Sequence, residues 1–285
     1  MRYKGNLHVH TTRSDGKKTP EDCIALYKQN GYDFLAITDH FRFFPDADKY
    51  CDETFTVLNG CELNFDSAPP NKSHHILCIE PENEVKFDRN MTPNEATKKI
   101  VESGGLSVLA HPYWSLMHFD DVLKLNNIIG LEIWNHISHA YASRGGSGVY
   151  ADVCAASGKK LLLFATDDAH FYDTDFFGGY IMVESPSNSK RDLLEAIKAG
   201  RFYCSQGPQI FKVERQSGKI VAETSPVCAI AFLSDALWAK DRVQTGENGQ
   251  EITGAVYEIK PNETYVRVEC YDKDGKTAWS QLIYL

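Results

Sequence analysis

Five short apolar segments in the first 170 residues each end in a histidine or a carboxylate, and this placement restricts the possible folds more than any other feature. The segments lie in residues 6–10, 34–40, 57–62, 107–112 and 161–170. Helix signals separate most of them, so strand and helix are expected to alternate about seven times. In a parallel α/β barrel the carboxyl ends of the strands open on one face, where their side chains converge. The sequence therefore predicts an α/β barrel whose mouth gathers these polar residues.

The first of these segments carries an H-x-H pair. Residues two apart in a strand point to the same face, so His8 and His10 are expected to lie side by side, while Val9 points away. Asp15 follows in a Ser-Asp-Gly turn, which can bring a carboxylate back over the same edge. Such a pair is a weak signal by itself, because many histidines pack in a core or lie on the surface without a metal.

The other segments supply further residues that can bind a metal. They end at or beside His40, Glu62, His111, Asp168 and His170. Imidazole and carboxylate ligands without thiolate suit zinc, manganese or iron. Together with the first segment they make eight candidate ligands, which are too many for one ion. The sequence therefore predicts two or three divalent metal ions, bridged by carboxylate and water.

Local signals place the other elements and divide the chain in two. Thr19 can cap a helix that starts at Pro20, and residues 92–95 have the arrangement of a capping box. We further expect strands at 74–79, 128–135 and 179–184, helices at 120–125, 147–157 and 189–199, and a loop at 66–73. From Pro208 onward, strand and hairpin patterns replace the helices. The predicted organisation is a barrel over 1–207 and a small, all-β, sandwich-like domain over 208–285.

Charge and composition exclude several classes of partner. The 285 residues carry a net charge of −9 and no basic run, so neither an extended nucleic-acid surface nor a membrane surface is expected. A small phosphorylated substrate is still compatible, because bound divalent metals would reverse the local field. The polar N-terminus and the lack of a long apolar segment predict a cytoplasmic protein, and its eight scattered cysteines are expected to be reduced. The oligomeric state stays open.

The ordered motifs resemble those of the PHP family, which is named for polymerase and histidinol phosphatase. They are H-x-H at His8 and His10, S-D-G at Asp15, T-D-H at His40, a lone Glu62, H-I-L at His75, A-H-P at His111, and D-x-H at Asp168 and His170. The resemblance covers about residues 3–208. It implies a distorted, TIM-like (β/α)7 barrel of seven strands, with a trinuclear metal centre and phosphoesterase activity.

The resemblance also implies which residues share each metal. The first metal would be held by His8, His10, Glu62 and Asp168, the second by Glu62, His75 and His111, and the third by Asp15, His40 and His170. Two of these positions have an adjacent alternative. His75 is preferred to His74 because H-I-L is the spelling of the family, and Asp168 is preferred to Asp167 because of the D-x-H motif.

The expected mechanism is attack of a metal-bridging hydroxide on phosphorus, while the cations neutralise the charge that develops on the phosphoryl oxygens. His136 or a metal-bound water could protonate the leaving oxygen, and the alternative for His136 is a core or surface position. Arg13, Arg42 and Arg144 are candidate phosphate ligands, because a guanidinium can bind two oxygens at once. Asn135, at a strand end, is a candidate substrate contact. His136, Arg144 and Asn135 are thus the candidate catalytic residues.

Three further features have two interpretations each. The Gly-rich segment 144–148 precedes a helix and could hold an anion on its backbone amides, or it could be an ordinary flexible loop. Asp39 could orient an imidazole, or it could be a solvated or capping carboxylate. Tyr113 and Trp114 could form a wall of the pocket or pack in the core.

The sequence favours hydrolysis of a small phosphate ester, a monoester rather than a diester. A metallohydrolase of a carboxyl or carbamate ester is the second hypothesis, because the same centre could direct attack on carbon, and some proteins that resemble this form are linked to that chemistry. The third hypothesis is a non-catalytic PHP module for binding or structure. Such modules often lack ligands, whereas all nine ligand positions are filled here.

Overall fold

The computed structural model describes residues 1–66, 73–83 and 85–285. Its strands are β1 (Arg2–Asn6), β2 (Phe34–Ile37), β3 (Thr56–Phe65), β4 (His74–Ile79), β5 (Leu106–Leu109), β6 (Gly130–Asn135), β7 (Leu162–Thr166), β8 (Tyr180–Glu184), β9 (Phe202–Ser205), β10 (Ile210–Gln216), β11 (Lys219–Val227), β12 (Ala229–Ser234), β13 (Val243–Thr245), β14 (Ile252–Glu258), β15 (Tyr265–Tyr271), β16 (Thr277–Trp279) and β17 (Ile283–Tyr284). Its helices are α1 (Pro20–Gln29), α2 (Pro93–Glu102), α3 (Phe119–Lys124), α4 (His136–Ala142), α5 (Gly148–Ala156) and α6 (Lys190–Lys198), with short 3-10 helices at Ala47–Tyr50 and Glu247–Gly249.

The helices α1 and α2 begin where the sequence predicts them. The Thr19 hydroxyl accepts a hydrogen bond from the backbone N–H of Asp22 at the start of α1. Thr92 and Glu95 form a complete capping box at the start of α2. Ser189 caps α6 in the same way as Thr19 caps α1. These side chains satisfy backbone N–H groups that have no partner within their helix.

The sheet of the α/β part is mixed, which corrects the prediction of a parallel sheet. β1, β2 and β3 are parallel neighbours, and so are β5, β6 and β7. β4 runs antiparallel between β3 and β5, and β8 runs antiparallel beside β1. The connection from β3 to β4 is residues 66–73, and a parallel crossover needs about a dozen residues or more. An antiparallel pair is therefore the only one this connection can join.

Among the described residues, the strands of the larger sheet pair in one path from β13 to β7, and no ladder closes this path into a barrel. The two parallel sets nevertheless meet at one point, because Val9 after β1 forms an isolated parallel bridge with Ala169 after β7. The observed architecture is thus a mixed α/β fold with a large sheet. The predicted closure into a seven-stranded barrel is not seen.

The core of the α/β part lies between the sheet and the helices. Phe34, Leu58, Val108 and Phe164 are fully buried members of its largest apolar cluster, which extends over β2, β3, β5 and β7. A smaller cluster includes Tyr27 of α1 and lies against β2. These apolar layers position the carboxyl ends of the strands, where the candidate ligands follow.

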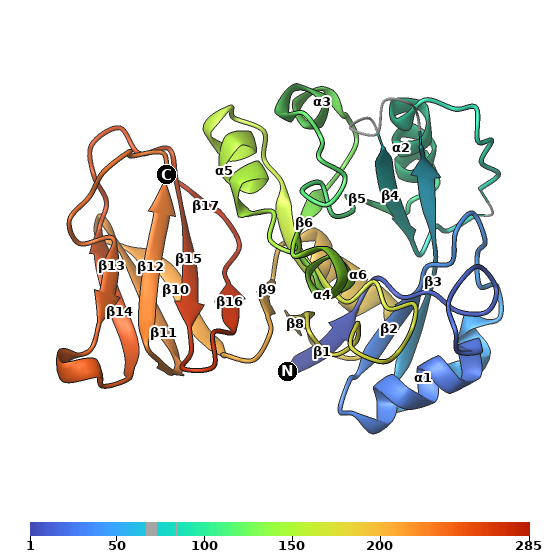
Figure 1. Ribbon diagram of the computed structural model, residues 1–285, viewed down its shortest axis with the longest axis horizontal. Coiled ribbons are helices and arrows are strands. Elements are labelled where there is room, and N and C mark those ends of the chain that lie inside the picture. The colour runs from blue at the N-terminus through green and yellow to red at the C-terminus, as the bar shows by residue number, and fades with distance from the viewer. Residues whose placement is uncertain (67–72, 84) are drawn as a thin grey trace.

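The C-terminal strands lie together at one end of the molecule, as Figure 1 shows in orange and red. β10, β11 and β14 form a three-stranded antiparallel sheet, whereas β12, β13, β15 and β16 extend the main sheet through β9. The expected hairpin between β10 and β11 turns at Ser217 and Gly218, which have φ of 47° and 82°. Because β16 pairs with β9, backbone hydrogen bonds join this all-β part to the rest of the chain.

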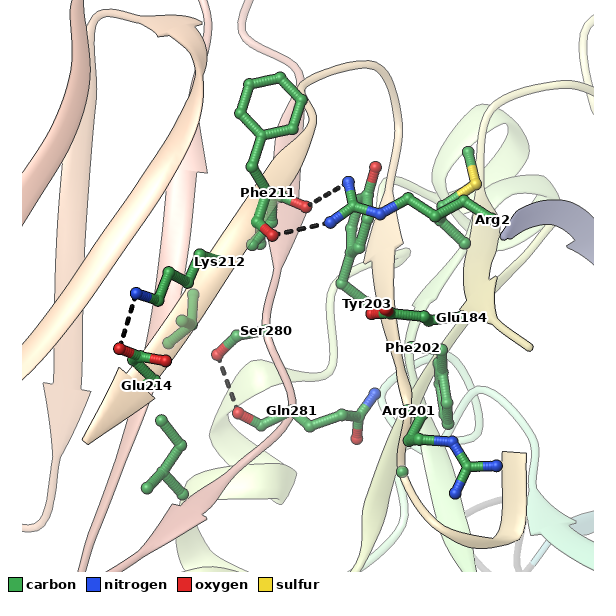
Figure 2. A pocket seen from close by; sticks show the side chains of 15 residues that line it. Arg2, Glu184, Arg201, Phe202, Tyr203, Phe211, Lys212, Glu214, Ser280 and Gln281 are labelled. Atoms are coloured by element: carbon green, nitrogen blue, oxygen red, sulfur yellow. Dashed lines mark hydrogen bonds and ion pairs between the residues drawn. The ribbon is translucent and has the colours of Figure 1, made fainter. Parts of the chain in front are cut away.

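Side chains reinforce this junction. Trp279 of β16 stacks on Trp134 of β6 with ring centroids 5.8 Å apart. Arg267 of β15 donates two hydrogen bonds of 2.8 Å to the carboxylate of Asp152 in α5. Figure 2 shows a cavity of about 420 Å³ between the two parts, where the guanidinium of Arg2 reaches two backbone carbonyls at the start of β10. These contacts brace the C-terminal strands against the α/β part.

Three other expectations need correction or comment. β3 continues to Phe65, so Glu62 lies inside a strand and not at its end. The helix α4 was not expected. It begins directly after β6 because the side chain of Asn135 accepts a hydrogen bond from the backbone N–H of Ser138. The loop expected at 66–73 lies largely outside the described residues.

None of the helices in the described ranges has the length and apolar character needed to cross a bilayer. All eight cysteines are free thiols, and six of them are buried.

Candidate metal centre

All nine predicted ligand residues lie around one edge of the α/β sheet. His8 and His10 follow β1, Asp15 lies in the loop beyond them, His40 follows β2, Glu62 and His75 lie in β3 and β4, His111 follows β5, and Asp168 and His170 follow β7. β1 itself ends at Asn6, so the H-x-H pair lies just beyond the strand, whereas the sequence predicted it within the strand.

Backbone contacts between the segments after β1 and β7 hold the first ligands. The N–H of Asp168 donates to the carbonyl of His8 at 2.8 Å, and the N–H of His10 donates to the carbonyl of Ala169 at 2.9 Å. Asp168 and His111 have φ of 57° and 26°. A positive φ is uncommon outside glycine, and such strain is concentrated at functional sites.

The candidate ligand atoms fall into three groups, and within each group they lie no more than 4.8 Å apart. The groups are His8, His10, Glu62 and Asp168; Glu62, His75 and His111; and His10, Asp15, His40 and His170. The first two groups contain the residues that the family resemblance implies, and the third adds His10 to the implied set. Glu62 and His10 each belong to two groups, so the three groups form one continuous centre.

The first group is buried and tightly convergent. Nε2 of His8 lies 3.2 Å from Nε2 of His10. Oδ1 of Asp168 lies 3.1 Å from both of these nitrogens. Oε2 of Glu62 lies 3.2 Å from Nε2 of His10. Two nitrogens and two carboxylate oxygens therefore face one small space.

Glu62 connects the first group to the second. Its Oε1 lies 2.8 Å from Nδ1 of His75 and 3.3 Å from Nε2 of His111. The third group is more open, because 54% of the Asp15 side chain is exposed, and its carboxylate lies 3.6 Å from a ring nitrogen of both His40 and His170. The centre thus extends from a buried interior to a solvent-accessible edge.

Glu132 of β6 belongs to the site, although the sequence did not predict it as a site residue. Its fully buried carboxylate accepts hydrogen bonds from His8 Nδ1 at 2.7 Å, the Thr166 hydroxyl at 2.6 Å, the His111 N–H at 2.8 Å and the Asn135 amide at 2.8 Å. Since Glu132 faces Nδ1 of His8, Nε2 is the nitrogen that faces the first group and that a metal would take once it has lost its proton. The available signal was a glutamate between Leu131 and Ile133 in an otherwise apolar strand.

Asn135 and Asp39 position ligand segments and do not line the cavity. Nδ2 of Asn135 donates to Oδ2 of Asp168 at 3.1 Å as well as to Glu132. Asp39 accepts hydrogen bonds from both the backbone and the hydroxyl of Thr11 and of Ser14. Asp39 therefore holds the loop that leads to Asp15. This agrees with the interpretation of Asp39 as a capping carboxylate, and not with the one in which it orients an imidazole.

Charges in the cluster shift the titration of its members. Burial by itself would lower the pKa of His10 and His75, but neighbouring carboxylates outweigh it. Asp168 and Glu62 raise the pKa of His10 to about 9, and Glu62 is foremost among the groups that raise the pKa of His75 to about 10. Burial would raise the pKa of Glu62, yet the histidines around it hold that pKa well below its usual range. The cluster thus favours positive charge between its donors.

The donor set fits divalent metal ions. Burial lowers the pKa of His40 and His170, so both rings are neutral near pH 7 and keep a lone pair. Nδ1 of His40 and Oδ1 of Asp168 are buried and have no hydrogen-bond partner within the described part of the chain. Buried polar atoms without a partner are rare in folded proteins. Imidazole and carboxylate donors that converge in this way suit zinc, manganese or iron, and a bound cation would take the place of the protons on His10 and His75.

The other predicted site residues lie outside the cavity. His136 begins α4, and its ring packs beside Trp134 and His139. Burial is the main cause of its lowered pKa. These contacts agree with the interpretation of His136 as a packed residue. The position of its ring outside the cavity gives no support to a role as general acid. Arg13 donates to the carbonyl of Phe43 at 2.9 Å and so points away from the ligands.

The remaining arginines and the Gly-rich segment are also engaged elsewhere. Arg42 donates to the carbonyl of Arg13. The backbone N–H of Arg144 donates to Ser138, and that of Ser147 donates to Ile133. At least two backbone amides of segment 144–148 therefore donate to other parts of the protein, and none of the three predicted arginines is among the described residues that line the cavity over the ligands.

A cavity of about 330 Å³ opens over the ligand cluster. Besides ligand residues, its walls consist of Trp114, Ile137, Ser138, Tyr141 and Phe171. Trp114 thus forms part of the cavity wall, which is one of the two interpretations that the sequence allowed. No lysine or arginine is among the described residues that line this cavity.

Comparison with known proteins finds a family match in the first part of the chain. Residues 6–125 match the family model of the PHP domain. This match covers less than half of the chain. An uncharacterised protein of Methanocaldococcus jannaschii is 25% identical over 146 residues, which make up 46% of this chain and 81% of that protein.

Solved structures extend the comparison beyond the PHP domain. A two-domain protein of Bacteroides vulgatus, described as containing a predicted PHP-like metal-dependent phosphoesterase, covers 100% of this chain and 95% of its own, with 16% identity and a TM-score of 0.55. This likeness shows that the two share a fold over both parts. An amidohydrolase of Chromobacterium violaceum, solved with bound sulfate and no metal, covers 70% of this chain and 96% of its own at 15% identity and a TM-score of 0.48.

Proposed function

We propose that this chain is a metal-dependent phosphoesterase that hydrolyses a small phosphate ester, with a monoester as the favoured substrate. One observation carries the proposal. Three groups of imidazole and carboxylate donors share Glu62 and His10 and converge beneath one open cavity. Such a set of adjacent donors is the arrangement that multinuclear metal hydrolysis requires.

Two or three divalent ions of zinc, manganese or iron are the proposed cofactors, held by the three donor groups in the order given above. When bound, they would polarise phosphoryl oxygens and make water nucleophilic near neutral pH. Three residues around the donors hold them in position. Glu132 fixes the tautomer of His8, Asn135 orients the carboxylate of Asp168, and Asp39 fixes the loop that carries Asp15. Hydrolysis then needs no serine or cysteine nucleophile.

Hydrolysis of a carboxyl or carbamate ester is the second candidate, and one observation favours it. No lysine or arginine lines the cavity within the described ranges, so the wall holds no guanidinium that could bind phosphate oxygens. A neutral ester would not need one. The two candidates share the metal centre and differ in the reacting atom.

The test is hydrolysis of p-nitrophenyl phosphate, bis-p-nitrophenyl phosphate and p-nitrophenyl acetate by protein reconstituted with manganese, zinc or iron. Variants His10→Ala and Asp168→Asn remove one shared and one buried ligand. Trp238→Ala, whose ring is 80% exposed in the C-terminal part, is the control. Phosphate release that depends on metal, disappears in both ligand variants and persists in the control would support the proposal. Cleavage of the acetate alone would favour the second candidate, and metal binding without any cleavage would favour a binding module.

A further inference from the structure

The cavity wall beyond the ligands carries exposed aromatic rings. Trp114, Tyr141 and Phe171 leave 41%, 53% and 47% of their surface accessible. All three line the cavity, and Ile137 lies among them. Large apolar side chains exposed together around one cavity are typical of a ligand surface, whereas the same residues scattered singly would need no explanation.

Trp114 forms one side of this wall. It follows His111 by three residues and lies edge-to-face against that ring, with centroids 4.9 Å apart. It makes a similar contact with His75 at 5.8 Å. The indole is therefore held directly beside the second ligand group, with much of its surface still accessible.

Phe171 and Tyr141 form a second side. Phe171 directly follows His170, and their ring centroids are 6.2 Å apart. Tyr141 of α4 packs edge-to-face on Phe171 at 5.3 Å, and its hydroxyl donates to Asp173. This pair is thus held beside the third ligand group. Aromatic surfaces accordingly flank the metal-ligand cluster near two different groups.

The charge of the wall complements this shape. Among the described lining residues the carboxylates and imidazoles are all members of the ligand set, and none of the lining residues is a lysine or arginine. A substrate can place one anionic group against the ligand cluster. A second phosphate would lie beyond the ligand cluster, against Trp114, Tyr141 and Phe171, where no lysine or arginine compensates its charge.

We infer that the substrate carries a single charged ester group and a planar aromatic group, and that the aromatic group binds between Trp114 and the Tyr141–Phe171 pair. The inference rests on the proposed function and narrows it. An aryl phosphate and a nucleoside monophosphate share this chemistry, and a nucleoside bisphosphate does not meet it.

Binding of two phosphonates that cannot be hydrolysed tests the aromatic site without the influence of leaving-group reactivity. Manganese-loaded protein is titrated calorimetrically with benzylphosphonate and with ethylphosphonate. We expect benzylphosphonate to bind about tenfold more tightly, as one well-packed aromatic contact allows. Trp114→Ala and Phe171→Ala should each reduce this ratio to about twofold, and Trp238→Ala should leave it unchanged. Both substituted rings are partly exposed, and thermal melts check the folding of the variants, with Phe171→Leu as a milder second variant.

A ratio near one in the unsubstituted protein, or a ratio that survives both cavity variants, overturns the inference. Hydrolysis of 1-naphthyl phosphate, adenosine 5′-monophosphate and adenosine 3′,5′-bisphosphate then separates the two sources of the ring. Preference for the naphthyl ester indicates an aryl phosphate, preference for the monophosphate indicates a nucleotide, and preference for the bisphosphate overturns the inference. Metal-dependent hydrolysis with no aromatic preference refutes the inference alone, whereas an aromatic binding preference without hydrolysis of any ester refutes the proposed function.

Discussion

Replacing Glu132 by glutamine would test whether this buried carboxylate controls the metal centre. Oε1 accepts from His8 Nδ1 and the Thr166 hydroxyl, and Oε2 accepts from the His111 N–H and the Asn135 amide. A glutamine has nearly the same shape but must place an NH2 group on one of these two sides. On the Oε2 side, that group would face two donors, of which the backbone N–H cannot reverse its role.

On the Oε1 side, the Thr166 hydroxyl could rotate to accept, but His8 would have to accept through Nδ1. Its proton would then move to Nε2, the nitrogen that faces the first ligand group. Either orientation therefore costs hydrogen bonds to a charged acceptor, which are worth about 1.5–3 kcal/mol each. Loss of a carboxylate behind a histidine ligand typically lowers metal affinity about 10- to 100-fold. We expect Glu132→Gln to do the same for the tightest manganese site.

The assay is calorimetric titration of metal-free protein with Mn²⁺, with the melting temperature as the check on folding. Glu263→Gln is the matched control, because Glu263 is also a buried carboxylate that accepts three hydrogen bonds, from Tyr257, Ser234 and Lys260, but lies in the C-terminal part. It should lower stability and leave metal affinity unchanged. If Glu132→Gln binds manganese within about twofold of the unsubstituted protein while folding normally, the positioning role is refuted.

Three further changes probe other parts of the molecule. Asp168→Asn keeps a residue that tolerates the positive φ, so the protein should fold, but the stabilisation by saturating metal, about 2.7 kcal/mol at 100 times Kd, should disappear from thermal melts. Arg267→Ala leaves Asp152 without its guanidinium partner and should lower the free energy of unfolding by about 3–5 kcal/mol in urea titrations. Burial lowers the pKa of His136 in the folded protein. Below about pH 6.5 the unfolded chain therefore binds more protons than the folded one, and the free energy of unfolding decreases as the pH is lowered. His136→Gln should make this fall shallower in denaturation curves between about pH 6.5 and 5.

Much of the local structure could be predicted because it depends on neighbouring residues in the sequence. The caps at Thr19, Thr92 and Ser189 satisfy donors within their own first turn, so their patterns can be read directly. The candidate ligands could be found for a similar reason, since each follows or lies in an apolar strand. Where a residue lies relative to a strand can be judged from the neighbouring sequence. The carboxyl ends of the strands then bring these residues together on one face.

Features that depend on tertiary contacts could not be predicted. Glu132 became significant only when β6 was placed beside the segments that carry His8 and His111. The partners of Arg13 and Arg42 are the backbone carbonyls of Phe43 and Arg13, which no pattern of side chains in the sequence indicates. The direction of β4 and β8 likewise depends on which strands are neighbours, and alternation of strand and helix does not determine that.

The composition of the cavity wall makes anion binding depend on metal. Glu62, Asp168 and Asp15 carry negative charge into the centre, and only imidazoles offset it, because the described lining residues include no lysine or arginine. A phosphate ester should therefore bind the metal-loaded protein more tightly than the metal-free protein, because divalent cations in the donor groups would add positive charge beyond that of the protonated imidazoles. By linkage, each anion that binds must then raise metal affinity by the same factor as metal raises anion affinity. Phosphonate that binds the metal-free protein as tightly as the metal-loaded protein would contradict the assignment of this cavity to a metal-dependent esterase.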